Sequence, residues 1–71
     1  MTLFLLAFDT DYKASVIELV KAVKGVHFLD KPGANGTVRL EIKRQTLDEE
    51  TMAIREIEDV PGVIDLRALR R

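Results

Sequence analysis

Few side chains of this sequence could perform acid–base, nucleophilic or metal chemistry. There is no cysteine and a single histidine, His27. Without cysteine the chain has no thiol nucleophile, no disulfide and no thiolate ligand for zinc. His27 falls on a short predicted edge strand with no serine or cysteine partner indicated, which is more typical of a surface or interface residue than of a general base. We therefore expect no catalytic residue.

Carboxylates offer the second possibility, a metal site. Four aspartates should lie near the loops at one end of the molecule: Asp9, Asp11, Asp30 and Asp59. Hard cations prefer clusters of such oxygen ligands. Each aspartate also has a simpler role, as a helix cap, a strand end or a solvated loop charge. We expect neither a bound metal nor a cofactor.

Composition limits the partners that the chain can have. Its 71 residues are 46% hydrophobic and 32% charged with a net charge of −1, which indicates one small globular domain, residues 1–71. It lacks the overall basicity that holds a phosphate backbone, so we expect no nucleic-acid partner. The opening apolar run, Met1–Phe8, is about a third of the roughly 20 residues that a transmembrane helix needs, and it lacks the features of a secretory signal. We expect a cytoplasmic protein with no membrane partner.

The elements that must position any site follow from hydrophobic spacing. Met1–Phe8 is apolar at all positions but one, which predicts a strand in the middle of a sheet. Helical spacing predicts a helix over Tyr12–Lys24, with Gly25 at its end. Val26–Asp30 and Thr37–Lys43 predict two strands joined by a turn that contains proline and glycine.

The second half of the chain repeats the pattern of a helix followed by a strand. Thr46 and Glu49 form a capping box, which predicts the start of a helix, and Pro61 with Gly62 predicts its end. Alternating residues over Val63–Leu69 predict a fourth strand.

The order β-α-β-β-α-β predicts an α+β fold of the ferredoxin-like kind, a βαββαβ sandwich. Its four-stranded antiparallel sheet should have the order 4-1-3-2, with both helices on one face. The expected apolar stripes of the helices are Tyr12, Val16, Leu19, Val20 and Val23, and Leu47, Ala53, Ile54 and Ile57. The residues expected to be buried are Phe4, Val16, Val20, Phe28, Leu40, Ile54, Ile57 and Leu66.

This fold leaves one face of the sheet without helices, and an apolar stripe should lie on it. The larger alternate residues of the first strand should face the helices, where volume is needed, so the stripe consists of Leu3, Leu5 and Ala7. The charged residues expected beside it are Arg39, Glu41 and Lys43 on one side, and Asp65 and Arg67 on the other. Two other interpretations stay open: long Arg and Lys stems shield the stripe, or it forms a homodimer contact.

A set of turns and strands resembles one known family. It comprises Gly25-Val26, a turn that ends at Gly36, the alternating strand Thr37–Lys43, a charged helix, and Val60-Pro61-Gly62-Val63. In these features the chain resembles the NapD family of small chaperones for periplasmic nitrate reductase, over nearly its whole length.

The resemblance implies a binding protein and not an enzyme. NapD-like proteins hold the twin-arginine signal peptide of the reductase precursor as a helix on the open sheet face, and so prevent premature export. By this resemblance Leu3, Leu5 and Ala7 would receive the apolar side of the peptide, while Glu41 and Asp65 would meet its arginines. Arg39 and Arg67 complete the expected peptide-binding surface.

A function of another class is also compatible with this fold. Regulatory modules of the Lrp-effector or ACT type dimerise through the sheet and bind an amino acid between subunits. Such a module would form a stable dimer that buries the stripe, whereas a peptide chaperone would be mostly monomeric with a free sheet face.

Overall fold

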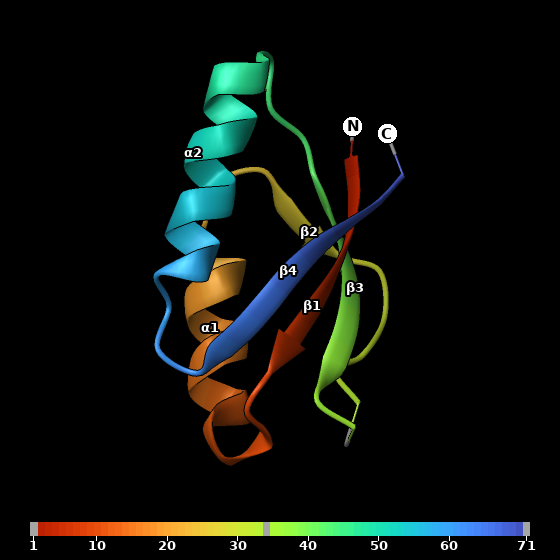
Figure 1. Cartoon of the computed structure of the whole chain (residues 1–71), viewed down its shortest axis with the longest axis vertical. Coiled ribbons are helices and arrows are strands. Elements are labelled where there is room, and N and C mark those ends of the chain that lie inside the picture. Colours follow the sequence, from red (N-terminus) through yellow and green to blue (C-terminus); the bar gives the residue numbers. More distant parts are fainter. Residues whose placement is uncertain (1, 34, 71) are drawn as a thin grey trace.

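The elements of the structure, a computed structural model that describes residues 2–33 and 35–70, follow the predicted order (Figure 1). The strands are β1 (Thr2–Phe8), β2 (Val26–Phe28), β3 (Thr37–Ile42) and β4 (Val63–Arg70). The helices are α1 (Lys13–Lys21) and α2 (Leu47–Glu58), and a 3-10 turn at Thr10–Tyr12 precedes α1. Met1, where the first strand was expected to begin, lies outside the described residues.

The four strands form one antiparallel sheet in the order β2-β3-β1-β4, which is the predicted order counted from the opposite edge. The ferredoxin-like α+β fold is therefore confirmed. Both helices lie on one side of the sheet, on the left in Figure 1, and none of the described residues forms a helix on the other side. Among the described residues, no helix has the length and apolar character needed to cross a membrane.

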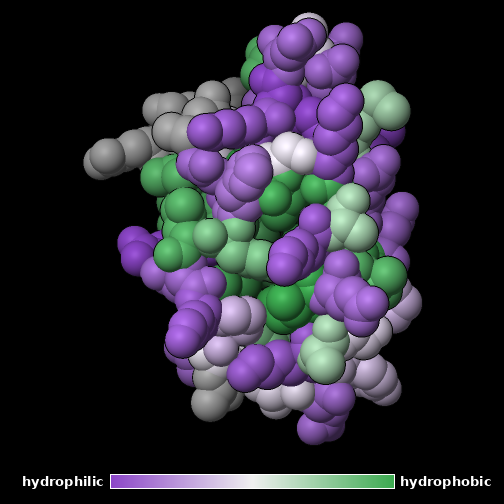
Figure 2. Space-filling model, turned by 180° about the vertical axis from the view of Figure 1, so that it is seen from behind, coloured by the Kyte–Doolittle hydropathy of each residue, from purple (hydrophilic) through white to green (hydrophobic). Residues whose placement is uncertain are grey.

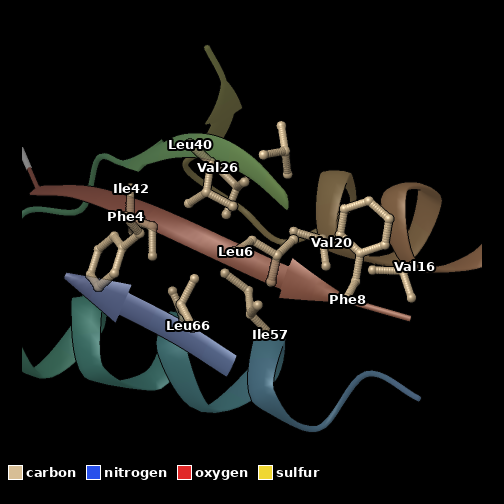
Figure 3. Close-up of a cluster of buried hydrophobic side chains, with 12 residues drawn as sticks. Phe4, Leu6, Phe8, Val16, Val20, Val26, Leu40, Ile42, Ile57 and Leu66 are labelled. Carbon is tan, nitrogen blue, oxygen red and sulfur yellow. The ribbon is translucent and has the colours of Figure 1, made fainter. Parts of the chain in front are cut away.

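Alternation along β1 separates the core from the open face. Phe4, Leu6 and Phe8 are at most 3% exposed and point towards the helices, as predicted from their volume. Figure 3 shows these three side chains among residues of β3, α1, α2 and β4. Six of the eight residues expected in the core are buried: Phe4, Val16, Val20, Leu40, Ile57 and Leu66.

The other two expected core residues, Phe28 and Ile54, are half-buried and pack against the edge of the core. Phe28 ends the short edge strand β2, which has a neighbour on one side only.

Three residues of the expected helical stripes are exposed. Leu47 is 66% exposed because it is the first residue of α2, beyond the part of the helix that covers the sheet. Leu19 is 46% exposed since it lies about 100° around the helix from the buried Val20. Tyr12 is 55% exposed because it belongs to the 3-10 turn and not to α1. These predictions were wrong.

Helix α1 also ends three residues earlier than Lys24. After Lys21 the chain continues in tighter turns, in which the Val23 N–H donates to the Val20 carbonyl and the Val26 N–H to the Val23 carbonyl. Gly25 then adopts a φ of +86°, a left-handed conformation that glycine takes without strain, and directs the chain into β2.

Side-chain hydrogen bonds cap the start of the 3-10 turn and the start of α2. The Asp9 carboxylate accepts from the Asp11 N–H at 3.0 Å and so caps the 3-10 turn. At α2 the Thr46 hydroxyl accepts from the Glu49 N–H at 3.1 Å, as the capping box predicted. The Glu49 carboxylate in turn accepts a hydrogen bond from the N–H of Gln45, the residue before the cap, at 3.3 Å.

Candidate functional site

The open face of the sheet is built around the three apolar residues of β1 that point away from the helices. Leu3, Leu5 and Ala7 are half-buried, and they alternate with the buried residues of the same strand. We call these three residues the apolar row. It lies where the sequence predicted it, in the interior of the sheet between β3 and β4.

Strand register places a charged residue on each side of the row. Leu5 is opposite Arg39 on β3 and Arg67 on β4. Leu3 is opposite Glu41, and Ala7 is opposite Asp65. All seven residues proposed from the sequence as a peptide-binding surface therefore lie on one face, with an acid near each end of the row and two arginines at its middle.

Among the side chains that the structure describes, the charged residues of this face form three ion pairs of unequal geometry. Asp30 and Arg39 are joined by two hydrogen bonds, from Nε at 2.7 Å and from Nη2 at 2.9 Å. The Lys43–Glu41 and Arg67–Asp65 pairs are longer, at 3.7 and 4.0 Å. A two-point contact fixes an arginine, whereas a single contact near 4 Å at the surface contributes little free energy.

The contact between Asp30 and Arg39 shifts the pKa of both groups. The hydrogen bonds from Arg39 lower the pKa of the Asp30 carboxyl below its ordinary value, and the same contact raises the pKa of Arg39. Asp30 is thus a carboxylate that already has its partner. Glu41, whose side chain is only 15% exposed, and Asp65 are the acids of this face with loosely held partners.

Asp30 was not among the site residues expected from the sequence, where it was considered only as a metal ligand or loop charge. The pairing of β2 with β3 explains this contact, because the Leu29 N–H donates to the Arg39 carbonyl and so brings Asp30 beside that arginine. The Asp30–Arg39 contact could be predicted from the sequence only if the register between β2 and β3 were known. That register is difficult to predict because β2 has only three residues.

A hollow adjoins the apolar row at Leu5. It has a volume of about 390 Å³ and lies between β1 and the connection from β2 to β3. Figure 1 shows this connection curving out on the side of the sheet that carries no helix. The residues around the hollow are Leu5, Asp30, Lys31, Gly33, Asn35, Thr37, Val38 and Arg39. The sequence predicted the turn between β2 and β3 but not the hollow that this connection forms with β1.

A second hollow lies beside α1 and shares no lining residue with the hollow at Leu5. Figure 2 shows hydrophobic residues at the bottom of a depression that is surrounded by hydrophilic ones. A hollow beside α1 is lined by Ala14 and Ile17, by charged residues of the same helix and by Pro32. It is separate from the apolar row, and no prediction from the sequence concerned it.

The residues considered for catalysis and metal binding are not brought together. His27 is exposed on β2, opposite Glu41 in the register. Within residues 2–33 and 35–70, no group of three or more His, Cys, Asp or Glu side chains is arranged to hold a metal ion. Asp9 serves as a cap and Asp30 as the partner of Arg39.

Comparisons of the chain with protein-family models, with curated proteins and with solved structures gave no match.

Proposed function

We propose that this chain is a binding protein and not an enzyme, and that it holds an amphipathic helical peptide on the open face of its sheet. One observation carries the proposal: a half-buried apolar row, Leu3, Leu5 and Ala7, lies between two charged rows on a face without helices. The resemblance to the NapD family suggests the ligand, a twin-arginine signal peptide of a nitrate reductase precursor. The chain would then act as a cytoplasmic chaperone before export.

The length of the row sets the length of the peptide. Leu3 and Ala7 are four residues apart on an extended strand, a span of about 13 Å at ~3.3 Å per residue. A helix rises 1.5 Å per residue, so roughly nine residues cover this span. A peptide with apolar side chains at positions i, i+3 or i+4, and i+7 would place them along the row.

The charges flanking the row favour a peptide that also carries arginine. Glu41 and Asp65 lie on opposite sides of the row, and their partners Lys43 and Arg67 are 3.7 and 4.0 Å away. A peptide guanidinium can bind a carboxylate with two parallel hydrogen bonds, so it can replace these longer contacts. Asp30 is excluded from this role because Arg39 already binds it in that way.

Apolar contact should supply most of the affinity, because exposed ion pairs contribute only about 0–1 kcal/mol each. We expect Leu5→Ser to weaken binding of a fluorescently labelled signal peptide about tenfold, as measured by anisotropy, since contact with a partly buried leucine is worth roughly 1.4 kcal/mol or more. Leu47→Ser is the matched control, because this leucine is 66% exposed on α2, away from the row. Equal affinity of the parent and Leu5→Ser would contradict the proposal.

The hollow beside Leu5 favours a second candidate, the dimerising regulatory module. Its volume of about 390 Å³ suits a small ligand such as an amino acid. In this alternative the apolar row is a contact between two copies, so Leu5→Ser should convert a stable dimer to a monomer. Sedimentation of the parent and of this variant separates the two candidates.

A further inference from the structure

Strand β4 is an edge of the sheet, and its outer side is uncovered. Within residues 2–33 and 35–70 its one neighbouring strand is β1, and no described element lies in front of it in Figure 1. Two irregularities interrupt its pairing with β1, where Ile64 and Leu69 are each skipped by the register. Both residues are exposed, Ile64 at 70% and Leu69 at 49%. Between them, Asp65–Ala68 is a regular stretch of edge strand.

The direction of the backbone groups on this stretch follows from β1. The Phe8 N–H donates to Gly36 on the β3 side, and the Asp9 N–H donates to Gly62 on the β4 side. Amide directions alternate along a strand, so the backbone groups of Leu5 and Ala7 point towards β4. Their register partners Arg67 and Asp65 therefore direct their own N–H and C=O groups towards β1. The N–H and C=O groups of Leu66 and Ala68 therefore point outwards, where an added strand could bind them.

We infer that two copies of this chain join through their β4 edges into one eight-stranded antiparallel sheet, with Leu66 opposite its own counterpart. This inference goes beyond the proposed function, because it concerns the edge of the sheet and leaves the apolar row uncovered. When a two-fold axis pairs β4 with β4 of a second copy, hydrogen bonds form only if residues whose N–H and C=O groups point outwards lie opposite each other. Only registers centred on Leu66, or on a neighbouring residue of the regular stretch, satisfy this.

Charge selects between these registers. Centring on Leu66 places Asp65 of each copy opposite Arg67 of the other, which gives two opposite-charge pairs across the junction. Centring on Arg67 places the two Arg67 side chains opposite each other, which is destabilising. Within one copy the Arg67–Asp65 contact is long, at 4.0 Å, and both side chains are more than half exposed, so either can exchange its partner.

Apolar contact adds to the same register. Centring on Leu66 brings Ile64 opposite Ala68 of the second copy, so an isoleucine that is 70% exposed in one chain would gain a neighbour. The two bulges limit the new pairing to a few residues, since bulges disturb an edge. The resulting interface is small, and we expect a weak dimer whose population rises with concentration.

Sedimentation across a range of concentrations tests the inference, without any peptide because Asp65 also belongs to the proposed peptide site. The parent should move from 8.0 kDa towards twice that mass as its concentration rises. Asp65→Arg alone should stay monomeric, because an arginine at position 65 of each copy would face Arg67 of the other. Arg67→Asp alone should also stay monomeric, because an aspartate at position 67 of each copy would face Asp65 of the other. An equimolar mixture of these two variants should recover the larger mass, because each strand then faces the opposite charge.

Two further variants separate this dimer from other effects. Glu58→Arg makes the same charge change on α2 and should leave the dimer intact. Ala68→Pro removes an outward N–H that β1 does not use, and it should abolish the dimer while the melting transition shows a folded monomer. A parent that stays at 8.0 kDa, a dimer that survives Asp65→Arg, or a mixture that stays monomeric would each overturn the inference.

Discussion

Arg39 shows how one unanticipated contact changes the character of a site. From the sequence, Arg39 was expected beside the apolar row as part of the peptide-binding surface. In the structure its guanidinium is held by Asp30 through two hydrogen bonds at 2.7 and 2.9 Å. The positive charge is thus neutralised locally. Arg67, whose contact with Asp65 is 4.0 Å long, is the more loosely paired cation beside Leu5.

The Asp30–Arg39 pair predicts a pH effect with a definite sign. The pKa of Asp30 is lowered from 3.8 in the folded protein, so the pair contributes stability above pH ~3.8 and loses it as the pH falls through the lowered value. The carboxyl ¹³C resonance of Asp30 should titrate below 3.8. In Arg39→Gln its midpoint should rise towards that value. A midpoint that does not change in this variant would show that Arg39 is not the cause.

At the scale of elements, the start of α2 is the feature that local sequence specifies most directly. The Thr46 hydroxyl accepts from the Glu49 N–H at 3.1 Å and satisfies a donor that has no partner within the helix. Thr46→Ala should lower the free energy of unfolding by about 1 kcal/mol, measured by urea denaturation. Thr51→Ala, at an exposed position inside the same helix, is the matched control. It removes a hydroxyl that donates to the Leu47 carbonyl at 2.9 Å, but the higher helix propensity of alanine offsets this loss, so it should have little effect. Equal losses in the two variants would contradict a capping role.

The two faces of β1 give a second prediction at this scale. Leu6 is 0% exposed under the helices, whereas its neighbour Leu5 is half-buried on the open face. Leu6→Ala should cost about 2–5 kcal/mol of stability, because it leaves a cavity in the core. Leu5→Ala should cost less than half as much, since its other side meets solvent and leaves no closed cavity. Comparable losses in chemical denaturation would mean that Leu5 is a structural residue and not a free binding residue.

Elements were predictable from the sequence where their signals are local, and less so where they depend on distant contacts. The alternation of Thr37–Ile42 and the cap at Thr46 appear within a few residues, and both were correctly predicted. The end of α1 was not, because Val20 and Val23 keep helical spacing while the backbone tightens to enter β2. The exposure of Leu47 depends on how far α2 extends past the sheet, which spacing alone does not show.

At the scale of the whole molecule, the sheet order was predictable because right-handed connections leave few arrangements for this succession of elements. The residues of β1 on the open face were also predictable, since alternate side chains of a strand lie on the same face of the sheet. The bulges at Ile64 and Leu69 were not predictable, because the alternation of Val63–Leu69 looks uninterrupted in the sequence. The register of β4 against β1 skips these two residues, and both large apolar side chains are exposed.

We propose that the apolar row and its flanking acids bind a peptide that carries both apolar residues and arginines. Titration of the ¹⁵N-labelled chain with a synthetic twin-arginine signal peptide tests it most directly. We predict that the amide resonances of Leu3, Leu5, Arg39, Glu41, Asp65 and Arg67 shift with increasing peptide, while those on the outer sides of α1 and α2 stay in place. A peptide in which both arginines are replaced by glutamine should bind more weakly. Resonances of the open face that do not move at millimolar peptide, or shifts confined to the hollow beside α1, would contradict the claim.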